Sequence, residues 1–252
     1  MFGRKKKQNV LPYSNSWFFG RDFGDNADFG IGQKEVWEIA NVLLDEPHVL
    51  IAGTTGSGKS VFLNSLIWSY LSFPFYYLFI DLKKVELIRY KSHPRTLGYA
   101  DEPNDAVEML KVVNILMDDR FETMKAKGQY KSTEYPLYIF IDEMGELITY
   151  KGVEEKITRI MRLGRAANIH VIMATQSPNR RVITANIQQN VTCAIALRCN
   201  SAIESRQVIR VGGAEKLPRY GYGILWNAEG YETIEIPMTP EEDIINRVKC
   251  GI

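Results

Sequence analysis

The sequence predicts an α/β protein with a mostly parallel central sheet and helices on both of its faces. Short, continuous apolar runs alternate with segments of helical periodicity, which is the pattern of such sheets. Two of the apolar runs end in an acidic residue, at Asp81 and Asp142, and a third runs into the glycine-rich stretch GTTGSGKS at 53–60. Parallel strands bind ligands at their carboxyl ends, so these features predict a site at one edge of the sheet.

The elements follow in order along the chain. A buried strand at 48–53 leads through the glycine-rich stretch into a helix at 60–72, and a second strand follows at 76–81. A long helix is predicted at 104–127, capped by Asn104 and ended by Gly128. The remaining elements are a strand at 137–142, an amphipathic helix at 153–163, strands at 169–176 and 192–198, a short helix at 202–211 and a hairpin around 228–230.

Composition limits the class of protein. The 252 residues are 45% hydrophobic and 24% charged, with a formal net charge of +1, so any contact with nucleic acid depends on a local basic patch. The basic cluster at residues 4–7 is interpreted either as a solvated tail or as a phosphate-binding arm. Cys193, Cys199 and Cys250 form no C-x-x-C pair, which fits a reducing cytosol. The apolar run at 66–80 is cut by a proline and is too short for a membrane span.

The stretch at 53–60 fits G-x-x-x-x-G-K-[ST], a phosphate-binding loop. Its glycines let the backbone N–H groups face the phosphates, and the following helix adds the positive end of its dipole. Lys59 is expected to reach the β- and γ-phosphates, and the Ser60 hydroxyl to bind Mg²⁺. The predicted ATP-binding residues are Gly53, Thr54, Thr55, Gly56, Ser57, Gly58, Lys59, Ser60 and Val61.

Acidic and amide side chains follow two other strands. Asp142 ends the run YIFID, where it can hold Mg²⁺ through water, and Glu143 beside it is expected to orient and deprotonate the attacking water. Gln176 ends the strand at 169–176 and is expected to contact the γ-phosphate or the water; the alternative is a polar residue without a role. Arg162 and Arg165, placed just after the helix at 153–163, are either surface arginines or donors to a phosphate under transfer.

An extended set of segments resembles the FtsK/SpoIIIE-type DNA translocases, in the wider group with HerA-like and conjugative coupling ATPases. The resemblance covers about residues 30 to 227, and in one segment Leu82 stands where the family usually has proline. The matching segments are PHVLIAGTTGSGKSVFLNSLI, FIDLKKVELIRY, DDRFETMKAKGQ, YIFIDEMGEL, RLGRAANIHVIMATQSPNRRVITANIQQNV and IESRQVIRVGGAEKLPRYGYGILW.

The resemblance implies a RecA-like P-loop NTPase that forms a hexameric ring, with ATP between subunits and double-stranded DNA in a central channel. It implies that Lys59 and Ser60 act at the phosphates, Asp142 and Glu143 at Mg²⁺ and the water, and Arg165 at the neighbouring subunit's nucleotide. With Gln176, predicted from its place at a strand end, Lys59, Glu143 and Arg165 form the expected catalytic set. Arg206 is a second candidate for that interface. Lys83, Lys84, Arg180 and Arg181 are possible contacts to DNA phosphates, or solvated loop charges.

The leading interpretation is therefore Mg-ATP-driven DNA translocation by a motor domain at residues 30–240, after an extended arm at 1–29 and before a helix or tail at 241–252. With no membrane segment and no large flanking domain expected, a mobile-element origin is favoured, such as conjugation. A relaxase, a membrane channel or a capsid portal could recruit the protein from the cytoplasm. A viral packaging ATPase, a non-translocating nucleotide switch or scaffold, and a small-molecule kinase are the alternatives.

Overall fold

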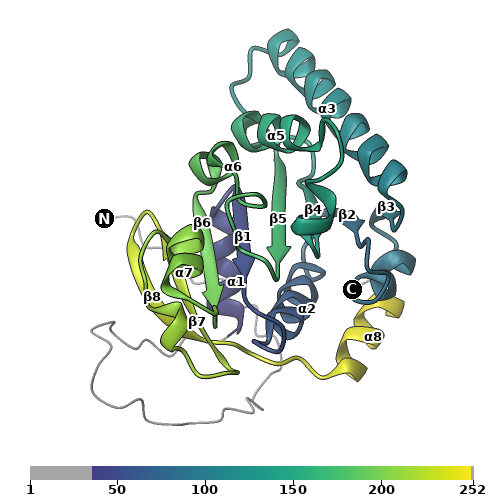
Figure 1. Ribbon diagram of the computed structural model, residues 1–252. Helices are drawn as coiled ribbons and strands as arrows, with labels where there is room; N and C mark the ends of the chain where they lie inside the picture. Colours follow the sequence, from purple (N-terminus) through teal and green to yellow (C-terminus); the bar gives the residue numbers. More distant parts are fainter. Residues whose placement is uncertain (1–35, 251–252) are drawn as a thin grey trace, which may run out of the picture.

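The computed structural model describes residues 36–250, and within this range eight strands form one sheet. The order across the sheet is β3-β2-β4-β5-β1-β6-β7-β8 (Figure 1). The six strands β1 to β6 run parallel, and β7 and β8 form an antiparallel hairpin at one edge. The bounds are β1 (His48–Ala52), β2 (Tyr76–Ile80), β3 (Thr96–Ala100), β4 (Leu137–Ile141), β5 (Ile169–Thr175), β6 (Cys193–Leu197), β7 (Tyr222–Asn227) and β8 (Gly230–Glu235).

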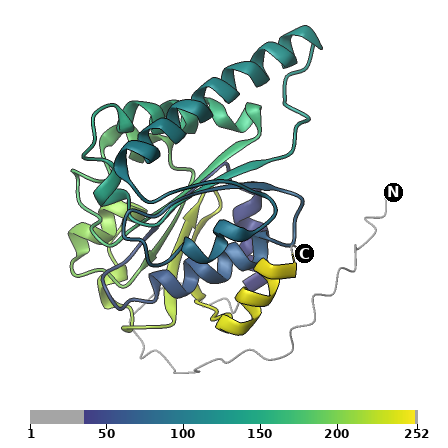
Figure 2. The ribbon, with the colours of Figure 1, turned by 90° about the vertical axis from the view of Figure 1, so that its right-hand side faces the viewer.

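Helices cover both faces of the sheet, and Figure 2 shows the sheet between the two helical layers. One layer packs α3 (Pro103–Ala126), α4 (Met144–Leu147), α5 (Val153–Ala167), α6 (Ala185–Asn190) and α7 (Ala202–Ile209) in one apolar core, with the short η2 (Ala214–Lys216). The other packs α1 (Val36–Asp45), α2 (Lys59–Tyr70), η1 (Ile88–Ser92) and α8 (Glu241–Cys250) in a second core. The predicted fold class is thus confirmed.

Several predicted helix boundaries are wrong by one to four residues, and two of them concern residues named above. Helix α3 begins at Pro103 with Glu102 as its N-cap, so Asn104 lies inside the first turn; proline suits that first position because its missing N–H has no partner there. Helix α5 continues to Ala167 and ends at Asn168 in the left-handed conformation, so Arg162 and Arg165 lie within the helix. The predicted arm at 1–29, including the basic cluster at 4–7, lies outside the described residues.

The order of the strands decides what meets at the carboxyl edge of the sheet. Strand β5 lies between β1 and β4, pairing with both in parallel. The glycine-rich loop after β1 is therefore separated from Asp142 after β4 by the end of β5. No helix among residues 36–250 has the length and apolar character that crossing a membrane requires.

Two buried histidines lie side by side at the opposite, amino edge. His48 in β1 is fully buried and its Nδ1 accepts a hydrogen bond from the Val171 N–H at 3.2 Å. The His170 ring stacks on Tyr138 with the ring centroids 4.6 Å apart. Burial lowers the pKa of His48 to about 3 and that of His170 to about 4, so both side chains are neutral in the folded protein at neutral pH.

These shifts predict that the protein loses stability in mild acid. Below pH of about 6.5 the unfolded chain protonates both histidines while the folded protein does not, down to their folded pKa values. In that window each histidine lowers the free energy of unfolding by about 1.4 kcal/mol for every unit by which the pH falls. His170→Phe keeps a ring against Tyr138 and should reduce the dependence of the free energy of unfolding on pH by the contribution of one histidine. Urea unfolding at several pH values measures it, and an unchanged slope in the variant would contradict the assignment.

Candidate functional site

The glycine-rich loop between β1 and α2 needs glycine at three positions. Gly56 and Gly58 have φ angles of +78° and +95°, a region that side chains with a Cβ rarely adopt. A Cβ on Gly53 would lie 2.5 Å from Ser57 Oγ and 2.8 Å from Leu197 Cβ, closer than packed atoms approach. The loop can follow this path only with these glycines.

The loop is held by the strands on either side of β1. The Gly53 N–H donates to the Thr175 carbonyl oxygen at 3.2 Å, and the Thr54 N–H donates to the Arg198 carbonyl oxygen at 2.9 Å. Helix α2 then begins at Lys59, and the N–H groups of its first turn have no partner within the helix. Loop and helix together present N–H donors to an anion, as phosphate-binding loops do.

Lys59 joins the loop to the end of β4. Its Nζ donates to Asp142 Oδ1 at 2.7 Å and to the Asp142 carbonyl oxygen at 3.0 Å, and both residues are buried. Burial raises the pKa of Asp142 above its usual value, although the Lys59 ammonium acts in the other direction. The pair places a cation and a carboxylate within reach of the phosphate-binding loop.

The residues present fit a Mg²⁺ ion bound together with nucleotide. Mg²⁺ is commonly held by one or two protein oxygens together with the phosphates and water, and the buried Asp142 with the half-buried Ser60 offers that set. Within residues 36–250 no group of three or more His, Cys, Asp or Glu side chains is arranged to hold a metal by itself. The fit is therefore to a metal that arrives with a phosphate ligand.

Glu143 is also buried, and hydrogen-bond donors surround its carboxylate. Oε1 accepts from Thr175 Oγ1 at 2.7 Å and from the Gly145 N–H at 3.2 Å. Oε2 accepts from the Gln176 N–H at 3.1 Å and from Lys83 Nζ at 3.0 Å. Burial alone would raise the pKa of Glu143, but the bonds from Thr175 and Lys83 outweigh it, so the pKa lies below the usual value.

Gln176 connects the loop to Glu143. Its side-chain Oε1 accepts a hydrogen bond from Thr55 Oγ1 at 3.0 Å, while its backbone N–H donates to Glu143. The amide therefore lies between the phosphate-binding loop and the acid that follows Asp142. The structure brings together Lys59, Asp142, Glu143 and Gln176 at one edge.

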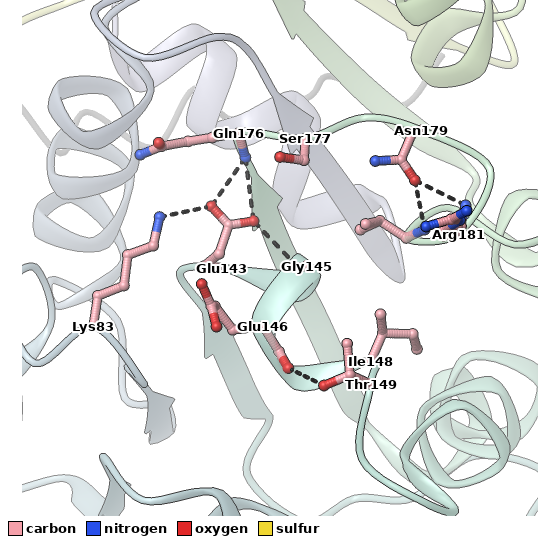
Figure 3. Close-up of a pocket in the computed structure, with 11 residues that line it drawn as sticks. Lys83, Glu143, Gly145, Glu146, Ile148, Thr149, Gln176, Ser177, Asn179 and Arg181 are labelled. Atoms are coloured by element: carbon pink, nitrogen blue, oxygen red, sulfur yellow. Dashed lines mark hydrogen bonds and ion pairs between the residues drawn. The ribbon is translucent and has the colours of Figure 1, made fainter.

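A cavity of about 420 Å³ opens beside Glu143. Lys83 reaches Glu143 from one side of it, and Arg181 lies at the other side (Figure 3). Gln176 and Glu146 also line it. Two of the four basic residues named as possible DNA contacts, Lys83 and Arg181, thus line this cavity next to the candidate catalytic acid.

The other predicted residues lie elsewhere. Lys84 forms an exposed ion pair with Glu102, and Arg180 is exposed on the loop after β5. Arg206 is exposed on α7. Arg165 is exposed near the end of α5, at the amino edge of the sheet, where its charge helps keep the pKa of His170 low. Strand β5 spans seven residues, so Arg165 lies about 20 Å from its own Gln176.

Three residues at this edge were missed from the sequence. Arg198 follows β6 as Gln176 follows β5, so the rule that strand ends meet could have found it. Thr175 donates to Glu143 from the last position of β5. Arg219 lies over the loop, where a Cβ on Gly56 would be 3.5 Å from its Nη2; no local pattern signals this contact, because it joins segments far apart in the chain.

Comparison with known proteins finds a family and several relatives. The model of the FtsK/SpoIIIE family matches residues 25–151. The DNA translocase FtsK of Tropheryma whipplei is 36% identical in an alignment of 205 residues that covers 71% of this chain and 28% of that protein. The DNA translocase FtsK of Listeria monocytogenes is 36% identical in an alignment of 220 residues that covers 77% of this chain and 29% of that protein. The chain thus spans less than a third of the length of these relatives.

Solved structures share the fold. The conjugation coupling protein TcpA of pCW3, solved with ATPγS, superimposes with a TM-score of 0.73 at 23% identity, over 83% of this chain and 66% of TcpA. The type VII secretion ATPase EccC of Thermomonospora curvata gives 0.70 at 22%, over 80% of this chain and 27% of EccC. The genome packaging NTPase B204 of Sulfolobus turreted icosahedral virus 2, solved with AMPPCP, gives 0.53 at 15%, over 77% of this chain and 97% of B204.

Gly53→Ala tests whether the observed path of the loop is what binds phosphate. The added Cβ would meet Ser57 and Leu197, so the loop must shift, and we expect nucleotide affinity to fall about tenfold or more with a measurable loss of thermal stability. Gly212→Ala is the matched control, since its Cβ would meet atoms only at 3.6 Å and beyond. Titration with a fluorescent nucleotide measures the affinity, and unchanged binding in Gly53→Ala would refute the loop assignment.

Proposed function

Because the chain belongs to the FtsK/SpoIIIE family of P-loop ATPases, we propose that residues 30–240 are the Mg-ATP-hydrolysing motor of a ring that moves double-stranded DNA. The single observation that carries this proposal is the group of side chains at the carboxyl edge. There the buried pair of Lys59 and Asp142 lies beside the phosphate-binding loop, with Glu143 and Gln176 next to it. A protein that only binds a nucleotide does not need an acid at the position of Glu143.

The loop, Lys59 and Ser60 are proposed to bind the phosphates of ATP. The loop N–H groups and the Lys59 ammonium would neutralise phosphate charge, and the bond to Asp142 keeps that ammonium at the mouth of the loop. Ser60 and Asp142 would hold Mg²⁺. The metal, when bound, would balance negative charge on the β- and γ-phosphates.

Glu143 is proposed to accept the proton of the attacking water. Asp142 is engaged by Lys59, so the two neighbouring acids have separate partners and can have separate roles. Gln176 would orient the water or the γ-phosphate, since its side chain contacts Thr55 in the loop while its backbone N–H holds Glu143. An acid with a lowered pKa is ionised at neutral pH, as a general base must be.

The basic residues on the loops after β2 and β5 are proposed to contact DNA phosphates. Lys83, Lys84, Arg180 and Arg181 follow strands that end at the nucleotide site, so a pull on DNA and a change at the nucleotide can be mechanically linked. A motor must move over any sequence, and contacts to phosphates carry no sequence information.

Sharing of the active site between subunits is supported by the position of Arg165. It lies at the edge opposite its own Glu143, so it can approach a nucleotide only on another subunit. Arg206 on α7 is proposed as a second contact at the same interface. The resulting ring, expected to be a hexamer, would enclose the DNA.

A conjugation-type transfer system in the cytoplasm is the context we favour, with a relaxase or membrane channel as the recruiting partner. TcpA, a conjugation coupling protein, shares the fold over most of this chain. Genome packaging with a capsid or portal partner is the second candidate, because the fold is also that of the packaging NTPase B204. A nucleotide-dependent switch or scaffold is the candidate of another class.

The test of the proposed function is the ATPase rate with and without duplex DNA. We expect duplex DNA to raise the rate of the wild-type protein. Glu143→Gln should still bind ATP but lose turnover by about a hundredfold or more in both conditions, because only water activation is removed. A wild-type ATPase rate that is the same with and without duplex DNA would favour the nucleotide-dependent switch. Near-normal turnover in Glu143→Gln would mean that another group is the base.

A mixing experiment tests the shared site. Arg165→Ala should bind ATP normally and hydrolyse it about a thousandfold more slowly, since a guanidinium supplied in trans stabilises charge on the transferred phosphoryl group. Lys59→Ala should be inactive for a different reason. Mixed rings contain interfaces in which an intact Lys59 faces an intact Arg165, so partial ATPase recovery is expected on mixing. Full activity of Arg165→Ala by itself would contradict the assignment.

A further inference from the structure

The carboxylate of Glu143 has no free position for a water molecule in the observed geometry. Four donors lie within 3.2 Å of its two oxygens, and a carboxylate has about four acceptor positions. A general base must accept a hydrogen bond from the water that it deprotonates. One of the four donors therefore has to leave before Glu143 can act as the base.

Lys83 is the donor that can leave. The other three are Thr175, the last residue of a fully buried strand, and two backbone N–H groups at Gly145 and Gln176. Lys83 lies on the turn after β2 and reaches Glu143 through a long side chain that is 34% exposed, whereas the Glu143 side chain is 5% exposed. Its ammonium can turn into the cavity without disturbing the sheet.

The cavity offers the Lys83 ammonium a second position, away from Glu143. Lys83 and Arg181 come from loops after two different strands and face the same 420 Å³ space (Figure 3). The Arg181 side chain is exposed, so its charge is available at the cavity mouth. The two cations on opposite sides of one opening can each donate hydrogen bonds to phosphate groups at its mouth.

We propose that Lys83 is a positioning residue whose ion pair keeps Glu143 from acting in hydrolysis, and that the phosphates of duplex DNA, bound at this cavity by Arg181 and Lys83, draw the Lys83 ammonium away and free Glu143. This inference rests on the proposed function and adds to it a direct route from DNA contact to ATP hydrolysis. Hydrolysis without DNA would then be suppressed in each subunit by its own ion pair.

Lys83→Gln tests the restraint. It should raise the ATPase rate without DNA about tenfold, because a neutral amide holds the Glu143 carboxylate more weakly than the Lys83 ammonium does. The KM for ATP and the rate at saturating DNA should stay near wild type. Lys83→Arg keeps the charge and should restore the low rate. Lys111→Gln is the matched control, because Lys111 pairs with Glu108 at the same 3.0 Å on the exposed face of α3. A rate without DNA that equals or falls below wild type would overturn the restraint.

Binding of DNA without nucleotide tests the release. Lys83→Gln should reduce the slope of log affinity against log salt concentration by about one, since one phosphate contact is lost, while Lys111→Gln leaves it unchanged. A raised basal rate with an unchanged slope would overturn DNA as the releasing partner. If the wild-type protein neither binds duplex DNA nor responds to it, the proposed function fails as a whole. If the wild type responds and Lys83→Gln behaves like it in both measurements, only this inference fails.

Discussion

The buried ion pair between Lys59 and Asp142 is the interaction on which the arrangement of the site depends. Both side chains are almost completely removed from water, so each charge needs the other. The pair ties the start of α2 to the end of β4, two segments that no strand pairing joins directly. Once this contact is made, Glu143 is held beside the phosphate-binding loop, because it follows Asp142 in the chain.

Strand β5 makes that contact sterically possible. By pairing with β1 on one side and β4 on the other, it sets the spacing that Lys59 must bridge. Its last residue, Thr175, holds the loop through its carbonyl oxygen and Glu143 through its hydroxyl group. The next residue, Gln176, contacts the same two segments: its side-chain Oε1 accepts from Thr55 in the loop, and its backbone N–H donates to Glu143. A shift at this strand end would therefore move both the phosphate-binding loop and the acid together.

The two edges of the sheet have different chemistry. The carboxyl edge gathers charged and amide side chains, among them the buried pair of Lys59 and Asp142, and a cavity lies beside Glu143. The amino edge holds two histidines that burial keeps neutral, and Arg165 lies nearby on the surface. One subunit thus has the phosphate-binding groups at one edge and the candidate trans-acting arginine at the other. This separation suits the proposed ring, in which a neighbouring subunit would supply Arg165.

Local patterns determined the elements and much of the site. Continuous apolar runs predicted β1, β2, β4, β5 and β6, because strands covered on both faces carry no polar alternation. The loop motif and the polar residues at strand ends predicted Lys59, Asp142, Glu143 and Gln176, because each of these signals lies within a few consecutive residues. Only the tertiary structure decided the strand order, the half-exposed edge strand β3 and the partner of Lys83. Lys83, predicted as a possible contact to DNA phosphates or as a solvated loop charge, contacts Glu143, 60 residues further along the chain. Such pairings depend on which segments the packed cores bring together, and no short-range pattern of the sequence records them.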